Sequence, residues 1–249
     1  MGPPSNNMRA EFFTKTNLEY IGTKTETFMR EQLDQNQSEI CDLIRFVLDD
    51  EISFLQCLAS SYKHANGFDK IVLMQGSNFK LRLHLYGSAD TVVIAENVHS
   101  HRWPFASSIL HGSIMMDIFQ NTKSNPANKM EESLSDHDHV ETFVHYIYHS
   151  DKQKGYFETV RIGPTELRQM STIKYHKGQT YSMNVSDMHR IVSCHNHAIT
   201  LMLTGKPVST TCNLFSPRAE LLQGETAIVP YSTDELKAKL SSTLTLLQE

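Results

Sequence analysis

Between residues 68 and 231, apolar residues recur at every second position, and this period constrains the fold more than any other feature of the chain. The segment holds ten short runs rich in β-branched and aromatic residues, such as KIVLM, FKLRLHLYG, TFVHYIYH and HAITLMLTG, and Gly, Asn, Asp or Pro separates most of them. Ten short strands in about 160 residues, with no helical pattern between them, predict an antiparallel sandwich or barrel.

The two ends of the chain follow a helical period instead. The segment SEICDLIRFVLDDEISFLQCLASSYKHANG opens on Ser38, a candidate N-cap, and predicts one helix that stops by Gly67. Its apolar stripe consists of Ile40, Leu43, Ile44, Val47, Leu48, Ile52, Leu55 and Leu58. A weaker pattern over 17–33 predicts an earlier helix. Near the C-terminus, Ser232 and Glu235 have capping-box spacing before a helix that carries Leu236, Leu240 and Leu247.

These patterns predict a mainly β protein in three parts. We expect an N-terminal helical lobe over residues 1–67, a β-barrel over 68–231 and a short C-terminal helix over 232–249. The polar stretch 121–139 predicts a long surface loop that could lie across the barrel mouth.

Composition narrows the range of partners. The net charge of -5 argues against nucleic acid, since neutralising phosphates needs a concentrated basic surface. No apolar run approaches the roughly 20 residues that cross a bilayer, and the first residues lack the layout of a secretory signal. We therefore expect a cytoplasmic protein with no membrane partner.

His99 and His101, in the stretch VHSHRWPF, are the strongest candidate metal ligands. If these two residues lie in a strand, both rings project from one face, because residues two apart share a face. Their backbone positions are then roughly 7 Å apart. Neutral imidazole suits Fe, Zn, Cu and Ni. An isolated pair of this kind is more often two solvent-facing histidines, so the surrounding sequence has to decide.

The surroundings resemble the cupin family. HSHRWPFASSILHG is similar to the first cupin motif, in which a pair of histidines precedes a further ligand position and a glycine. GQTYSMNVSDMHRIV resembles the second motif, with His189 in the ligand place, and TLMLTGKP resembles the strand that follows. The resemblance implies a double-stranded β-helix, or jelly-roll, barrel, a metal held by His99, His101 and His189, and a homodimer formed through edge strands.

Departures from the family pattern narrow the implied chemistry. Phe105 stands where many cupins have a glutamate, which leaves a three-histidine site similar to that of thiol dioxygenases related to cysteine dioxygenase. That likeness implies Fe(II), with O2 as co-substrate. Cysteine dioxygenases carry a Ser-x-His-x-Tyr series on the later strand, whereas this chain has Thr200, Met202 and Thr204, so cysteine dioxygenase activity itself is not expected.

Other residues are candidates for the substrate side of the site. Arg82 shares a polar strand face with His84 and Tyr86 and is the best clamp for a substrate carboxylate, unless that face is the exposed one. Tyr181 and Tyr175 could each bring a phenol to the metal, with core packing as the alternative. Trp103 is expected in the pocket wall, and Arg102 and Arg190 are expected to point away from the metal. Glu96 has the wrong strand parity for a ligand. His111 is expected outside the ligand set.

The function that these features favour is a non-haem Fe(II) oxygenase acting on a small, anionic, amino-acid-like molecule. With the same ligands, Zn or Ni would instead support a lyase or an isomerase. A cupin that binds a small ligand without catalysis is the third alternative.

Overall fold

The computed structural model describes residues 12–64, 67–87, 91–93, 96–122, 139–151, 156–217 and 229–248. The expected loop over 121–139 lies almost entirely outside these ranges. The helices are α1 (Lys15–Ile21), α2 (Glu26–Asn36), the 3₁₀ turn η1 (Gln37–Glu39), α3 (Ile40–Asp49), α4 (Glu51–Ser60) and α5 (Thr233–Gln248). The strands are β1 (Tyr62–Lys63), β2 (Phe68–Gln75), β3 (Lys80–Tyr86), β4 (Thr91–Val93), β5 (Val98–His99), β6 (Phe105–Asn121), β7 (Val140–Asp151), β8 (Tyr156–His176), β9 (Thr180–Met183), β10 (Met188–Thr204), β11 (Thr211–Ser216) and β12 (Val229–Pro230).

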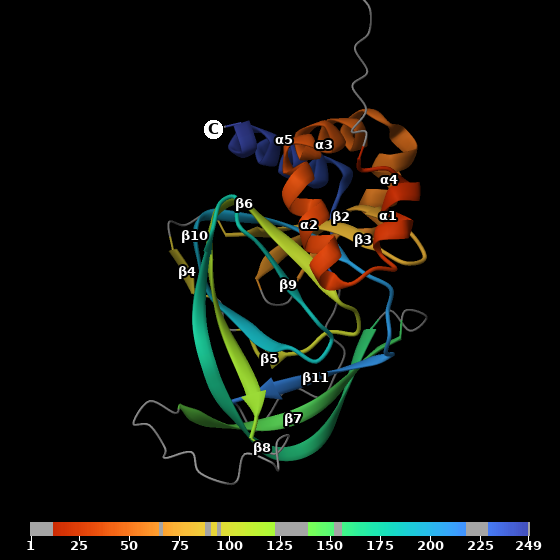
Figure 1. The fold of residues 1–249 in the computed structure, drawn as a ribbon. Helices are drawn as coiled ribbons and strands as arrows, with labels where there is room; N and C mark the ends of the chain where they lie inside the picture. Colours follow the sequence, from red (N-terminus) through yellow and green to blue (C-terminus); the bar gives the residue numbers. More distant parts are fainter. Residues whose placement is uncertain are drawn as a thin grey trace, which may run out of the picture.

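The prediction of a mainly β protein with helices at both ends is confirmed (Figure 1). The strands form one antiparallel sheet whose pairings return to their starting point: β10 pairs with β6, then β8, β7, β11 and β5 follow, and β5 pairs with β10 again. The closing contact is a single residue pair, His99 opposite His189. The strand pairing itself therefore brings the two predicted motifs together.

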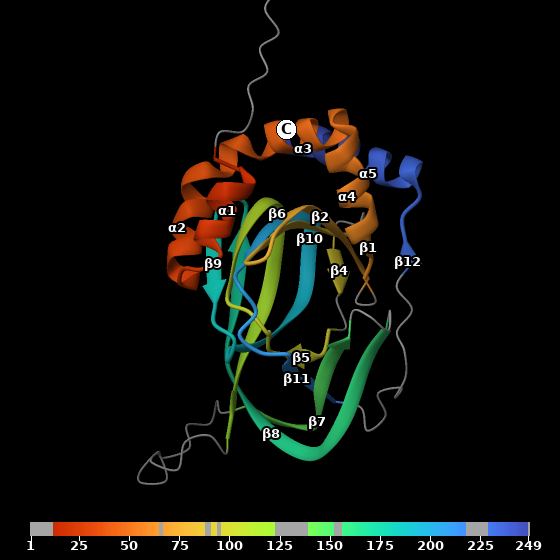
Figure 2. The same ribbon diagram turned by 90° about the vertical axis from the view of Figure 1, so that its right-hand side faces the viewer.

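The helices gather at one end of the sheet, over β2, β3 and the adjoining parts of β6 and β10 (Figures 1 and 2). On strand β3, Leu81 and Leu83 belong to the apolar core beneath the helices, and so do Leu201 and Leu203 on β10. All four side chains are fully buried. Because strand residues alternate between faces, the residues between these leucines turn to the opposite face, which we call the inner face.

The single helix expected from Ser38 onward is wrong. The chain breaks at Asp50, whose side chain accepts a hydrogen bond from the amide of Ser53 at 2.8 Å and so caps α4. The new direction exposes Ile52 and Leu55, by 69% and 54%, and buries Phe54 instead. The predicted stripe is therefore correct on α3, whereas on α4 only Leu58 packs against the core.

Three smaller helix predictions have mixed outcomes. The weak helix over 17–33 is two helices, α1 and α2, which separate after Gly22. Ser38 lies within η1, and Gly67 lies in the turn between β1 and β2 with φ +84°. The capping box is confirmed, since Ser232 N donates to Glu235 at 2.9 Å and Glu235 N donates back at 3.2 Å.

Two long strands run through a glycine, a residue type expected to separate strands in this chain. Gly112 does not end its strand: β6 continues through it with φ +69°, beside a bulge where Asn196 and His197 also have positive φ. A Cβ on Gly112 would lie 2.3 Å from the carbonyl oxygen of His195, so only glycine fits this close approach. Strand β8 likewise runs through Gly163.

No helix in the described part of the chain is long and apolar enough to cross a membrane.

Candidate metal centre

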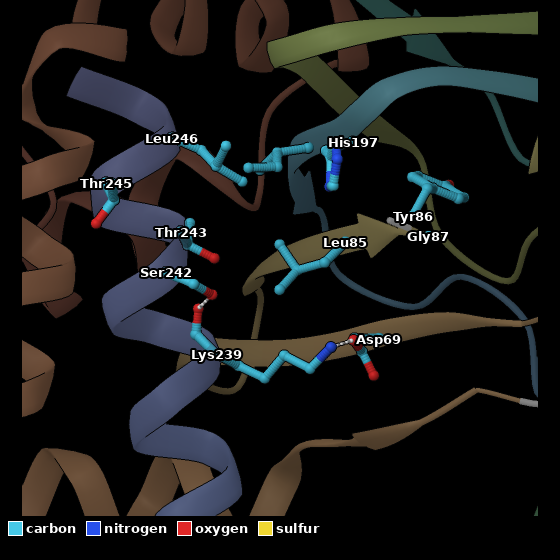
Figure 3. Close-up of a pocket in the computed structure, with 11 residues that line it drawn as sticks. Asp69, Leu85, Tyr86, Gly87, His197, Lys239, Ser242, Thr243, Thr245 and Leu246 are labelled. Atoms are coloured by element: carbon cyan, nitrogen blue, oxygen red, sulfur yellow. Dashed lines mark hydrogen bonds and ion pairs between the residues drawn. The ribbon is translucent and has the colours of Figure 1, made fainter. Parts of the chain in front are cut away.

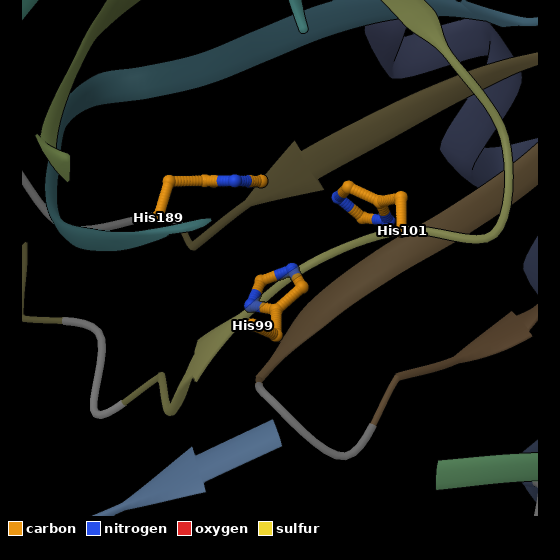
Figure 4. A group of neighbouring side chains, drawn as sticks. All are labelled: His99, His101 and His189. Atoms are coloured by element: carbon orange, nitrogen blue, oxygen red, sulfur yellow. The ribbon is translucent and has the colours of Figure 1, made fainter. Parts of the chain in front are cut away.

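The structure brings His99, His101 and His189 together (Figure 4). Their ring centroids lie 4.7 to 5.2 Å apart, and one possible ligand nitrogen of each lies within 4.8 Å of the others. His99 comes from β5 and His189 from β10, whereas His101 follows the end of β5. The three rings point toward one another, which is the arrangement that one ion with several imidazole ligands requires.

The hydrogen bonds of these rings leave nitrogens free to bind. The Nδ1–H of His99 donates to the carbonyl of Asn97 at 2.9 Å, which fixes the tautomer and leaves Nε2 with its lone pair. His101 Nε2 and His189 Nδ1 are buried and have no hydrogen-bond partner among the described residues. Two unsatisfied buried nitrogens are costly in a folded protein, and metal binding would satisfy them. The donor set therefore fits a divalent ion.

The environment keeps the rings of His101 and His189 uncharged. Burial lowers the pKa of both His101 and His189 well below its usual value, and the neighbouring His99 ring lowers both further. Only the neutral imidazole binds a metal, so a low pKa favours the binding form near neutral pH.

Phe105 occupies the place beside the histidines where the resemblance would put a glutamate. It is fully buried and lies edge-on to His101, with ring centroids 4.8 Å apart, and 6.0 Å from the ring of His189. No carboxylate of the described residues joins the three histidines as a potential ligand. The candidate centre is thus made of neutral ligands only.

Arg82 lies on the inner face and is only 4% exposed. Its Nη2 donates to the sulfur of Met202 at 2.9 Å, while its Nε has no partner among the described residues. Burial lowers the pKa of its guanidinium to about 10. The alternative of an exposed outer face for Arg82 is therefore wrong, and a role in binding a carboxylate stays a prediction.

Tyr181 is also buried on the inner face. The register places Arg82, Met202, Ser107 and Tyr181 side by side across β3, β10, β6 and β9. Phe105 neighbours both the phenol and the histidine cluster, with its ring 6.1 Å from that of Tyr181 and 4.8 Å from that of His101. Tyr175 stacks on Tyr181, with ring centroids 4.6 Å apart. Burial raises the pKa of Tyr181, so the phenol stays protonated.

Arg102 and Arg190, which follow two of the clustered histidines in sequence, have different surroundings. Arg190 forms ion pairs with Asp117 at 3.0 Å and Glu141 at 3.4 Å, as expected for a residue directed away from the metal. Arg102 has no acidic partner among the described residues and instead packs on the indole of Trp103 at 4.8 Å. The expectation for Arg102 assumed a strand through residues 99–103, but β5 ends at His99.

The remaining candidates lie outside the ligand set. Glu96 accepts a hydrogen bond from the amide of Ile191 at 2.8 Å, and His111 Nδ1 lies 3.3 Å from the carbonyl oxygen of His197. Sequence reasoning places His84 on the polar strand face of Arg82 but gives it no role, and it is 7% exposed with no partner for its Nε2 among the described residues. Its place on the same strand face as Arg82 was the available signal.

A separate hollow of about 550 Å³ lies between α5 and the end of β3 (Figure 3). Lys239 and Asp69 form an ion pair of 2.6 Å beside it, and Leu85, Ile199 and Leu246 contribute apolar lining. None of the three clustered histidines lines it, so this hollow is not part of the candidate metal centre.

Comparisons with known proteins leave the family open. No family model matches the chain, and no curated protein matches its sequence. Solved structures with a partial likeness include hydroquinone 1,2-dioxygenase PnpCD in complex with Cd2+ and 4-hydroxybenzonitrile, with a TM-score of 0.31, 8% identity, and coverage of 55% of this chain and 63% of the other. The hydroquinone 1,2-dioxygenase of Sphingomonas sp. TTNP3 with 4-hydroxybenzoate bound has a TM-score of 0.31 and 10% identity, with coverage of 57% of this chain and 66% of the other.

The polyketide cyclase RemF from Streptomyces resistomycificus has a TM-score of 0.24 and 11% identity, over 76% of this chain and 92% of the other. The matches to the two dioxygenases span less than two thirds of their lengths. At these TM-scores, the function has to be argued from the chain's own residues.

Proposed function

We propose that this protein is a metal-dependent enzyme of the cupin type, with residues 68–231 as its barrel, and that it is a non-haem iron oxygenase acting on a small anionic molecule. The observation that carries the proposal is the convergence of His99, His101 and His189, two of which have a buried ring nitrogen without a hydrogen-bond partner among the described residues. These histidines would hold the metal, which when bound supplies Lewis acidity and, as Fe(II), reactivity toward O2.

The protein's own contribution is to bind and orient the substrate. Three neutral ligands leave the positive charge of a divalent metal uncompensated, which favours an anionic substrate. Arg82 would hold the carboxylate of an amino-acid-like molecule, because its planar guanidinium matches that group. Phe105 excludes water from one side of the ligand rings, and Tyr181 lies behind it as a protonated phenol.

Metal analysis and oxygen consumption test this proposal together. Protein purified without O2 is expected to contain about one iron per chain and to consume O2 with a member of a panel of small amino and hydroxy acids. Stoichiometric zinc or nickel that supports turnover without O2 would establish a lyase or an isomerase instead. A protein that binds such acids but converts none of them, with or without metal, would be a binding protein.

A further inference from the structure

Two arginines pack on one tryptophan next to the candidate metal centre. The guanidinium carbon of Arg82 lies 5.4 Å from the centre of the Trp103 ring, and that of Arg102 lies 4.8 Å from it. The same indole lies 5.9 Å from the ring of His101. Both arginines are therefore neighbours of one aromatic ring and, through it, of the metal ligands.

Neither positive charge has a counter-charge among the described residues. Among the described residues, the side chain of Arg82 donates only to the sulfur of Met202, and that of Arg102 forms no ion pair. The ionisable groups that act on Arg82 are phenols and the guanidinium of Arg102, with no carboxylate among them. Arg190 shows the usual arrangement in this protein, since Asp117 and Glu141 neutralise it.

Two like charges near one another in a partly dry environment are unfavourable unless an anion joins them. The indole adds a donor, because Trp103 Nε1 is buried without a partner among the described residues. From this we infer that Arg82, Trp103 and Arg102 form one recognition site for a doubly charged anionic group of the substrate, a dicarboxylate or a phosphoryl group. Arg82 is the inner contact and Arg102, which is less buried, is the outer one.

A singly charged carboxylate would neutralise only one of the two arginines. A dianion satisfies both, and each charge-assisted hydrogen bond to a guanidinium contributes to its affinity. This inference extends the proposed function by naming the class of substrate, and it rests on that proposal for the position of the ligand beside a metal. Binding of the anion to the arginines can nevertheless be measured without any metal.

The test uses the full-length protein after removal of metal by a chelator. Trp103 is the only tryptophan in the chain, so its fluorescence reports on this site alone. We would titrate the protein with malonate, inorganic phosphate and acetate at constant ionic strength, and repeat each titration by calorimetry. Malonate and phosphate are expected to bind at least about tenfold more tightly than acetate, a factor that corresponds to one charge-assisted contact.

Two variants assign the affinity to individual side chains. Arg102→Gln is expected to lower the affinity for malonate and phosphate about tenfold and that for acetate less than about threefold, whereas Arg82→Gln weakens all three. Arg45→Gln is the matched control, because Arg45 is exposed and pairs with Asp42 within α3. Arg102→Lys keeps the charge and is expected to retain part of the preference for dianions.

Equal affinities of the three anions in the native protein would overturn the inference, and so would an Arg102→Gln variant that behaves like Arg45→Gln. The metal content of each protein is measured separately. If the native protein binds metal normally but shows no preference for dianions, this inference is rejected and the proposed function stands. Histidines that bind no metal, beside an intact preference for dianions, would reject the proposed function alone.

Discussion

The two faces of strand β3 differ in whether their buried side chains carry polar atoms without hydrogen-bond partners. Toward the helices, Leu81 and Leu83 pack among other apolar side chains and leave no buried polar atom. Toward the inner face, Arg82 and His84 are almost as deeply buried, yet each retains a polar atom without a hydrogen-bond partner among the described residues. The alternation of strand side chains thus separates two environments within a few ångströms.

This difference suggests that the helix-covered face stabilises the fold and that the inner face binds ligands. Burial of leucines lowers the free energy of the folded state by roughly 1.5–3 kcal/mol for each side chain. An unsatisfied buried donor acts in the opposite direction by about 1–3 kcal/mol. The unsatisfied atoms of Arg82, Trp103, His101 and His189 lie around the metal centre, where a metal and an anion would satisfy them. Substitutions on the helix-covered face should therefore reduce stability and leave binding unchanged, whereas substitutions on the inner face should reduce binding without loss of stability.

The largest effect is expected for His189→Ala on the inner face. Removing one of three ligands should lower the affinity for a divalent metal by about a thousandfold or more, while the thermal unfolding midpoint of the metal-free protein changes little. Metal analysis after gel filtration and a competition titration with a chelator measure this. His111→Ala is the matched control, since His111 is a partly buried histidine outside the cluster. Normal metal occupancy in His189→Ala would show that this residue is not a ligand.

On the helix-covered face, Leu201→Ala should reduce stability instead. Leu201 is fully buried on the helix-covered face of β10, so truncation leaves a cavity and is expected to lower the free energy of unfolding by about 2–5 kcal/mol. Urea denaturation of the metal-free protein gives this value, and metal affinity in the folded variant should equal that of the native protein. A loss of metal affinity comparable to that of His189→Ala would mean that the two faces are not independent.

Arg82→Met sharpens the comparison, because it should raise stability while it abolishes binding. The substitution removes a buried, unpaired charge and keeps the side-chain volume, so the free energy of unfolding is expected to rise by about 1–3 kcal/mol. Malonate binding should be lost, and urea denaturation with calorimetry measures both quantities. A destabilised variant would indicate that Arg82 serves the fold and not a ligand.

Much of this organisation could be predicted from the sequence, because periodicity reports burial directly. The stripe of α3, the strand alternation around Arg82 and the meeting of His99 with His189 depend on local spacing or on an ordered pair of motifs. The errors have two sources. Asp50 is a local cap that begins a new helix inside an unbroken apolar pattern. Gly112 lies against the bulge of β10, a contact between strands that local sequence does not reveal.

The direction of Arg102 could not be predicted for a related reason. Alternation applies only within a strand, and β5 ends at His99 after two residues because its partners β11 and β10 meet it only there. The chain beyond His99 is irregular, so the packing of Arg102 on Trp103 depends on three-dimensional contacts alone. Sequence patterns therefore predicted the cluster of three histidines but not the second arginine of the proposed anion site.

The smallest expected effect concerns Glu235, the exposed carboxylate that helps to hold α5 on the helix-covered side. Its hydrogen bonds to Lys63 and to Ser232 lower its pKa to about 2. A carboxyl whose pKa is lower in the folded than in the unfolded state stabilises the protein above its unfolded pKa of about 4.3, and this contribution disappears as the pH falls through the folded value. The thermal midpoint of Glu235→Gln should therefore lie slightly below that of the native protein at pH 7.

That difference should shrink between about pH 4.3 and pH 2, where the native carboxyl becomes protonated and resembles the amide. Calorimetric scans at several pH values measure it, and metal affinity at neutral pH should be unchanged because Glu235 is remote from the inner face. A difference that stays constant down to pH 2 would show that the carboxyl contributes through its hydrogen bonds and not through its charge. In that case, the stability of the helix-covered side would depend on packing and capping geometry alone. The two sides would then differ further, because only the inner face would depend on charge.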